Sequence, residues 1–140
     1  MGYEKLTTKE KQVYLAKLEK TLRAKKLFLK NDFSMPDLAR ETGISLHVIS
    51  YIINSQLNSR FTDYVNLRRI AYFKEKINDV QWKDLSVKEM MLASGFKCKT
   101  TCYRAFNKHV GLSPSEYLKA NRTVYVLPKY SKTIFKVPQQ

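Results

Sequence analysis

Apolar residues recur every three or four positions along most of the chain, and this spacing is typical of amphipathic helices. Two long stretches follow the pattern, one over residues 8–26 and one over residues 60–78. Together with the shorter stretches around them, they predict an all-α fold of about seven helices. The apolar stripes are expected at Tyr14, Leu15, Leu18 and Leu22 in the first long helix, and at Phe61, Tyr64, Val65, Phe73 and Ile77 in the second.

Three helix starts are marked by a hydroxyl residue that is followed three positions later by glutamate. In such a capping box the hydroxyl accepts a hydrogen bond from an orphan backbone N–H, and the glutamate binds the N–H of the cap residue. Pro114 suits the first helical position, where its missing N–H costs nothing. The three pairs are Thr7 with Glu10, Ser86 with Glu89, and Ser113 with Glu116.

The chain contains an internal repeat. Residues 38–43 align with residues 90–95 at an offset of 52, and after one inserted residue the alignment continues at an offset of 53. Both copies place glycine after a first short helix, and Asn or Gly, which best tolerate the left-handed conformation, after a second. The aligned positions are Gly43 with Gly95; Ile49, Ile52 and Ile53 with Cys102, Ala105 and Phe106; Asn54 with Asn107; Asn58 with Gly111; and Tyr64 with Tyr117.

Each copy therefore has the pattern of a helix-turn-helix. In this motif a short helix and a turn containing glycine lead to a second helix, which can enter the major groove of DNA. Residues 79–85, with the only tryptophan, are expected to form a loop between the halves. The predicted segments are a lead-in and first helix (1–30), a first helix-turn-helix (31–59), a linker helix (60–79), a second helix-turn-helix (80–121) and a basic tail (122–140).

The second helix of each copy has a polar and aromatic face opposite its apolar residues. Such groups can form hydrogen bonds or stacking contacts with base edges, and the guanidinium of Arg104 can bridge O6 and N7 of guanine. Phosphate contacts are expected from Ser45, Lys97, Lys108 and Ser113. The candidate base-reading residues are His47, Ser50, Tyr51 and Asn54 in the first copy, and Lys99, Thr100, Tyr103 and Arg104 in the second.

The charge of the chain supports a polyanionic partner. There are 26 Lys and Arg against 12 Asp and Glu, a formal net charge of +14, and the excess lies in residues 1–30 and 90–140. A folded domain retains such self-repulsion mainly when a polyanion is its partner. Because no Lys or Arg lies between Arg40 and Arg60, we expect the second copy to supply most of the attraction to phosphate.

Catalysis, metals and cofactors have little support in the sequence. No spacing brings together the groups of acid–base or nucleophilic catalysis, and there is no phosphate-binding glycine loop. Cys98 and Cys102 are expected to be a reduced, partly buried pair, because a zinc site would need two more ligands at suitable spacing. We therefore expect a protein that is not an enzyme and that has no cofactor, metal or small-molecule ligand.

Three stretches resemble transcription regulators of the AraC/XylS family. Residues 33–45 resemble the family's first helix-turn-helix, residues 64–70 its linker helix, and residues 95–117 its second copy, ending in Gly-Leu-Ser-Pro-Ser-Glu-Tyr. This resemblance implies seven helices and two recognition helices that enter successive major grooves on one face of DNA. It also implies base contacts from the positions occupied by His47, Ser50, Tyr51, Lys99, Thr100, Thr101 and Arg104.

The chain departs from the family pattern at four positions. The family usually has Ala where Met91 stands, Phe where Cys102 stands, a small residue where Phe73 stands, and Ser where Cys98 stands. Cysteine is a poor substitute for a hydroxyl cap. We therefore expect changes in packing and in helix ends, with the fold class unchanged.

The predicted function is sequence-specific binding of double-stranded DNA by the output domain of a larger regulator that carries a sensor region. Expected partners are duplex DNA, RNA polymerase, and a second copy of the chain through helix one or an upstream region. The domain is expected to be soluble, cytoplasmic and nucleoid-associated, with a membrane anchor in the full-length protein as one option. The alternative is a basic helical module that binds a protein partner or a membrane surface through Lys17, Lys20, Arg23, Lys25 and Lys26 of helix one.

The tail, residues 122–140, alternates apolar and basic side chains. Two interpretations stay open at this point. One is a loose terminus, and the other is a packed strand or an arm that contacts DNA.

Overall fold

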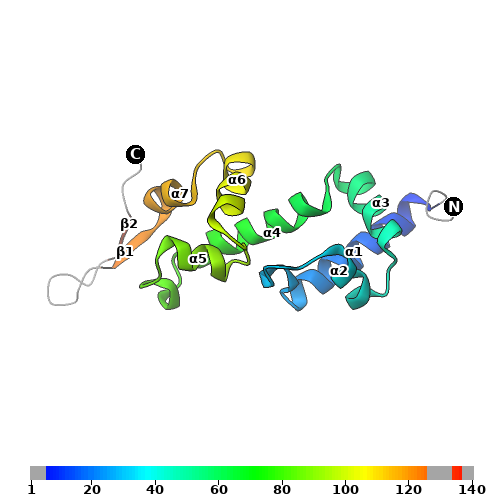
Figure 1. Ribbon diagram of the computed structural model, residues 1–140, viewed down its shortest axis with the longest axis horizontal. Helices are drawn as coiled ribbons and strands as arrows, with labels where there is room; N and C mark the ends of the chain where they lie inside the picture. The colour runs from blue at the N-terminus through cyan, green and yellow to red at the C-terminus, as the bar shows by residue number, and fades with distance from the viewer. Residues whose placement is uncertain (1–5, 126–133, 137–140) are drawn as a thin grey trace. The chain divides into compact units, whose positions relative to one another are not determined.

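The computed structural model describes residues 6–125 and 134–136, and that part of the chain contains seven α-helices (Figure 1). The predicted all-α class is confirmed, with one short strand pair added after the last helix. None of the described helices is both long enough and apolar enough to cross a bilayer. The helices are α1 (Thr8–Ala24), α2 (Met35–Thr42), α3 (Leu46–Leu57), α4 (Phe61–Lys76), α5 (Val87–Ala93), α6 (Lys99–His109) and α7 (Pro114–Asn121).

The chain divides into two compact units, Met1–Arg69 and Ile70–Gln140, and the division falls within α4. Residues 79–85 are not a loop between the halves, because Val80–Trp82 form a 3₁₀ turn inside unit 2. Trp82 is buried, and its ring centroid lies 6.4 Å from that of Phe73 in an edge-to-face arrangement. The tryptophan therefore belongs to the core of unit 2.

The predicted helix starts are present. All three predicted capping boxes form, and a fourth joins Ser34 and Asp37 at the start of α2. The backbone N–H of Ser34 donates to the Asp37 carboxylate at 3.0 Å and lowers the pKa of that group. The sequence pattern missed this box because it required glutamate, whereas the shorter aspartate closes it here.

Left-handed residues end the short helices where the repeat places them. The φ angles are 75° at Gly43, 99° at Gly95, 48° at Asn58 and 83° at Gly111. A Cβ added at Gly43 or Gly111 would meet nothing within 4 Å, so the backbone angle, rather than lack of space, favours glycine there. A further left-handed residue, Lys26 with φ 48°, follows α1, which ends at Ala24 rather than at residue 26.

A buried arginine joins α4 to the segment after α1 in unit 1. Arg69, on α4, is 7% exposed, and its guanidinium donates from Nε to the carbonyl of Phe28 at 2.7 Å and from Nη2 to the carbonyl of Lys30 at 2.9 Å. These carbonyls belong to the 3₁₀ turn Leu27–Leu29 and its cap. The fork geometry of the guanidinium satisfies one buried and one partly buried acceptor at once. The lowered pKa of Arg69 reflects burial of its charge.

Unit 2 has the same device. Arg122 follows α7 and donates from Nη2 to the carbonyls of Trp82 at 2.9 Å and Lys83 at 3.0 Å, at the 3₁₀ turn of unit 2. Arg69 and Arg122 are 53 positions apart, the offset of the internal repeat. The duplication thus extends to these residues, which we call the closing arginines.

Three of the four departures from the family's residue pattern lie in one core. Phe73, Met91 and Cys102 are all buried in the same cluster of unit 2. Phe73 and Met91 are larger than the usual family residues, and Cys102 is smaller. The added and lost side-chain volumes therefore partly compensate in the same cluster, and cores tolerate volume-conserving changes best. Burial raises the pKa of the Cys102 thiol to about 12.

Two short strands follow α7 and form an antiparallel pair. Together with Arg122 they are the part of the tail that the structure describes, and residues 126–133 and 137–140 lie outside the described residues. Of the two interpretations of the tail, these six residues show the strand. The strands are β1 (Thr123–Tyr125) and β2 (Ile134–Lys136), with Val124 opposite Phe135.

The closing arginines give a test of the fold. Replacing Arg69 with Met leaves buried carbonyls without their donors, and we expect unit 1 to lose about 1–3 kcal/mol of unfolding free energy. Arg69→Lys should recover only part of this loss, because an ammonium lacks the fork. Amide hydrogen exchange in α1 and α3 measures the change. Arg23→Met, at an exposed position of α1, is the control. Equal protection in the Arg69→Met and Arg23→Met proteins would contradict the role given to Arg69.

Candidate nucleic-acid interface

The first candidate recognition helix, α3, turns its apolar side inward. Ile49, Ile52 and Ile53 each have 0% exposure. The helix begins after Ser45, whose hydroxyl accepts a hydrogen bond from the backbone N–H of Val48 at 3.4 Å. Burial of the three isoleucines fixes which face of α3 is left for contacts outside unit 1.

The four predicted base-reading residues of α3 differ in exposure. His47 and Asn54 are exposed, whereas Ser50 and Tyr51 are half-buried. The side-chain amide of Asn54 donates to the carbonyl oxygen of Ser50 at 3.1 Å, so part of its hydrogen-bonding capacity is used within the helix. His47 and Asn54 are therefore the two exposed residues of the four.

A lysine from another helix lies against this face. Helix α1 packs on α3, and Nζ of Lys11 lies 5.0 Å from the ring centroid of Tyr51. Sequence reasoning missed this contact because the two residues are far apart in the chain and nothing in the periodicity of either helix points to it. Only the packing of α1 on α3 reveals it.

The second candidate recognition helix, α6, begins without a side-chain cap. Cys98 occupies the cap position but makes no capping hydrogen bond, as expected from the loss of the family's serine. Its Sγ instead lies 3.3 Å from Oγ1 of Thr101, and this contact lowers the pKa of the Cys98 thiol. Cys98 is exposed and Cys102 is buried, and both are free thiols, which confirms the predicted partly buried pair.

The polar face of α6 carries three exposed predicted residues. Lys99, Thr100 and Arg104 all lie on the surface, and Asn107 continues the same face. Thr101 is half-buried beside Cys98. The opposite side, formed by Cys102, Ala105 and Phe106, is buried in the core of unit 2. This side of α6 therefore presents a hydroxyl, an amide and two cations for recognition.

Tyr103 is less open than the sequence suggested. It is half-buried and packs against the core cluster of unit 2. Its hydroxyl lies 3.2 Å from Oγ of Ser115, and Nζ of Lys99 lies 5.3 Å from its ring centroid. Tyr103 is thus only partly exposed, because the turn after α6 brings Ser115 of α7 against its hydroxyl.

The predicted phosphate contacts flank the two helices. Ser45, Lys97 and Lys108 are exposed, and Ser113 is half-buried. The hydroxyls of Ser45 and Ser113 accept hydrogen bonds from the first turns of α3 and α7, which leaves their own protons to donate to a phosphate. Around α6 the only carboxylate in residues 90–122 is Glu116, and the backbone N–H of Ser113 binds it.

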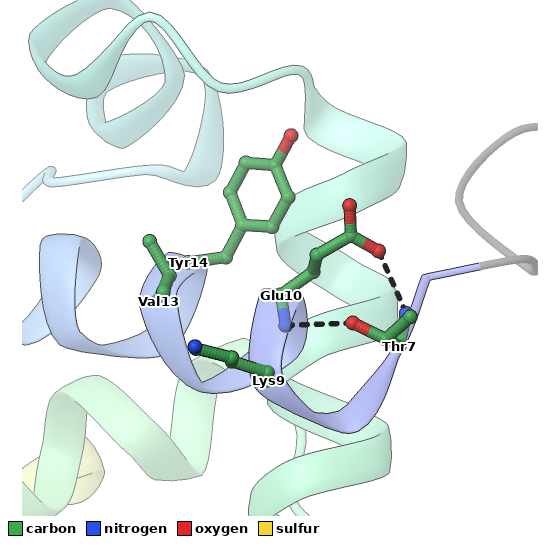
Figure 2. Close-up of a pocket in the computed structure, with 5 residues that line it drawn as sticks. All are labelled: Thr7, Lys9, Glu10, Val13 and Tyr14. Carbon is green, nitrogen blue, oxygen red and sulfur yellow. Dashed lines mark hydrogen bonds between the residues drawn. The ribbon is translucent and has the colours of Figure 1, made fainter.

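Depressions in the described surface lie away from these residues. One of about 510 Å³ is lined by Thr7, Lys9, Glu10, Val13 and Tyr14 at the start of α1 (Figure 2). Another, of about 280 Å³, lies between the start of α2 and the first turns of α4. Within the described residues, no group of three or more His, Cys, Asp or Glu is placed to hold a metal ion.

Comparison with known proteins agrees with this architecture. The family model described as "Helix-turn-helix domain" matches residues 38–120. The melibiose operon regulatory protein of Escherichia coli is 24% identical over 86 residues, which is 61% of this chain and 28% of that protein. The chain thus spans under a third of the length of this relative.

Two solved structures have a similar fold. A protein of unknown function from Listeria innocua has a TM-score of 0.57 and 26% identity, with 76% of this chain and 91% of that chain covered. The C-terminal domain of AraT, a response regulator from Geobacillus stearothermophilus, has a TM-score of 0.59 and 20% identity, with 72% and 82% covered. Because the family model covers more than half of the sequence, the chain belongs to the AraC-type helix-turn-helix family of DNA-binding transcription regulators.

Proposed function

We propose that this chain binds double-stranded DNA in a sequence-specific way, as the output domain of a transcription regulator. In this proposal α3 and α6 are the two recognition helices and enter successive major grooves. The observation that carries it is the duplicated helix-turn-helix, in which both second helices bury equivalent apolar residues and expose equivalent polar faces. A helix of this kind fits the major groove, where each base pair presents its own pattern of donors and acceptors.

The exposed residues carry the main roles in this proposal. His47, Asn54, Thr100 and Arg104 read base edges, because their polar side chains are exposed on the two helices. Ser50, Tyr51, Thr101 and Tyr103 are half-buried and make secondary contacts at the margins of the same faces. The contacts to phosphate are assigned to Ser45, Lys97, Lys108 and Ser113. Lys99 remains a base-reading candidate whose charge also attracts phosphate.

The proposal also covers the location and the partners of the longer regulator. We expect the domain to work beside the bacterial chromosome, in the cytoplasm, with a sensor region elsewhere in a longer protein. A membrane anchor in that longer protein is compatible with such an arrangement. RNA polymerase and a second copy of the chain are the protein partners that a regulator of this kind would use.

Binding to a membrane or protein surface through α1 has less support. Leu18 and Leu22, the centre of its apolar stripe, are 0% and 1% exposed, so they are already used inside unit 1. Nζ of Lys25 forms an ion pair with Glu41 at 2.6 Å. A helix that inserts in a membrane surface needs a free apolar face. The buried apolar residues of α1 lie on the helix that packs against α2 and α3.

Selection of bound sequences from a random duplex pool tests the proposal. The wild-type chain should recover two short conserved blocks about one helical turn, or about 10 base pairs, apart. Arg104→Ala should weaken binding to the selected site by about 1–3 kcal/mol of binding free energy. It should also relax the sequence preference at one base pair of one block. Arg23→Ala, at an exposed position of α1, is the matched control and should recover both blocks. A pool with no enriched sequence would contradict sequence-specific binding, and an equal loss on every sequence would make Arg104 a phosphate contact.

Salt dependence tests the proposed division between the units. The variants Lys99→Gln and Lys108→Gln should each flatten the slope of log affinity against log salt by about one unit, because each lysine displaces about one counterion. Lys88→Gln, at an exposed position of α5, is the control. The slope is measured by fluorescence anisotropy on one labelled duplex. Slopes that match the wild type in both variants would mean that α6 and its ends do not provide the phosphate attraction.

A further inference from the structure

The first recognition helix lacks basic residues of its own. The sequence has no Lys or Arg between Arg40 and Arg60, whereas α6 contains Lys99, Arg104 and Lys108. A helix in the major groove lies between two phosphate backbones, and neutralising those phosphates supplies much of the affinity. A cation for the first copy therefore has to come from another element.

Lys11 on α1 brings such a cation to α3. Its Nζ lies 5.0 Å from the ring centroid of Tyr51, within the distance of about 6 Å at which an aromatic face attracts an ammonium group. Lys11 is half-buried, so its aliphatic stem packs on the protein and limits where the charge can go. The contact is internal to unit 1 and fixes the ammonium beside α3.

The internal repeat relates Tyr51 to a cationic residue of the second copy. At the offset of 53, Tyr51 aligns with Arg104, the exposed guanidinium of α6. In the second copy the position itself is cationic, whereas in the first copy it is an aromatic ring that holds a cation from α1. The two copies thus have positive charge at equivalent positions of their recognition helices, obtained in different ways.

The start of α1 is built to hold Lys11 in place. The capping box immediately before it joins the N–H of Thr7 to the Glu10 carboxylate at 2.8 Å and the N–H of Glu10 to the Thr7 hydroxyl at 3.1 Å (Figure 2). Basic side chains in a first helical turn oppose the helix dipole, so Lys9 and Lys11 lie where helix stability alone would disfavour them. Their placement points to a partner outside the helix.

We propose that Lys11 contacts a DNA phosphate and that the ring of Tyr51 positions it, so that α1 forms part of the DNA-binding surface. The proposal rests on the proposed function and adds a residue to it. The contacted group is a phosphate rather than a base, because lysine is a flexible point charge and lies on α1 beside the helix that reads bases. Tyr51 then acts through its ring as a positioning residue, in place of the base contact expected from the sequence.

Four variants of the 140-residue chain test this proposal, with anisotropy measured against salt on the selected duplex and on a duplex of unrelated sequence. Lys11→Gln should flatten the salt slope by about one unit on both duplexes. Lys17→Gln, the same charge change at an exposed position of α1, should leave the slope unchanged. Tyr51→Phe, which keeps the ring, should keep the wild-type salt slope, whereas Tyr51→Leu should reproduce the slope change of Lys11→Gln. Circular dichroism confirms that each variant is folded.

The double variant Lys11→Gln/Tyr51→Leu completes the cycle and should bind no more weakly than either single variant, because both remove the same contact. Equal slopes for Lys11→Gln and Lys17→Gln would overturn the proposal. A change in the salt slope of Tyr51→Phe as large as that of Tyr51→Leu would also overturn it, because the hydroxyl rather than the ring would then be the group that matters. If Arg104→Ala weakens binding while Lys11→Gln has no effect, this inference alone fails. If neither duplex binds the wild-type chain, the proposed function fails with it.

Discussion

Each unit of this protein depends on an arginine that binds the carbonyls of a 3₁₀ turn, one from within α4 and one from the residue after α7. The closing arginines, Arg69 and Arg122, donate to backbone carbonyls at the 3₁₀ turns that precede α2 and α5. Those two helices have only eight and seven residues, too few to be stable without tertiary contacts. Each guanidinium holds its turn against its unit, and capping boxes at Ser34 and Ser86 then start the two short helices.

The recognition helices depend on that frame. The left-handed residues Gly43 and Gly95 redirect the chain from the short helix into α3 or α6, and the apolar stripe of each recognition helix then fills its core. Once the apolar side is buried, the polar side has only one direction to face. The same frame therefore presents two different surfaces, one neutral and aromatic on α3 and one cationic on α6. In the proposed function, duplication of the frame with divergence of the exposed faces lets one chain read two different blocks of DNA.

Local features of the fold could be predicted from the sequence, and long-range contacts could not. Capping boxes and left-handed glycines depend on residues three or four positions apart, so Thr7 with Glu10 or Gly111 after α6 were identifiable from spacing. The burial of Trp82, the hydroxyl contact of Tyr103 and the hydrogen bonds of the Arg69 guanidinium depend on residues 9, 12 and 41 positions away, and no periodicity encodes them. For the candidate site the pattern identified both helices and their exposed polar residues. It missed Lys11 because that residue belongs to a different helix.

The most direct test of the central claim is the backbone amide spectrum of the chain during titration with a duplex that carries both conserved blocks. If both units read DNA, signals from residues 46–54 of α3 and residues 99–107 of α6 should shift together and saturate at one duplex per chain. Signals from the core around Phe73 should stay in place. Shifts confined to one unit, or gathered on Lys17 and its neighbours in α1 while α3 and α6 are unchanged, would contradict the account.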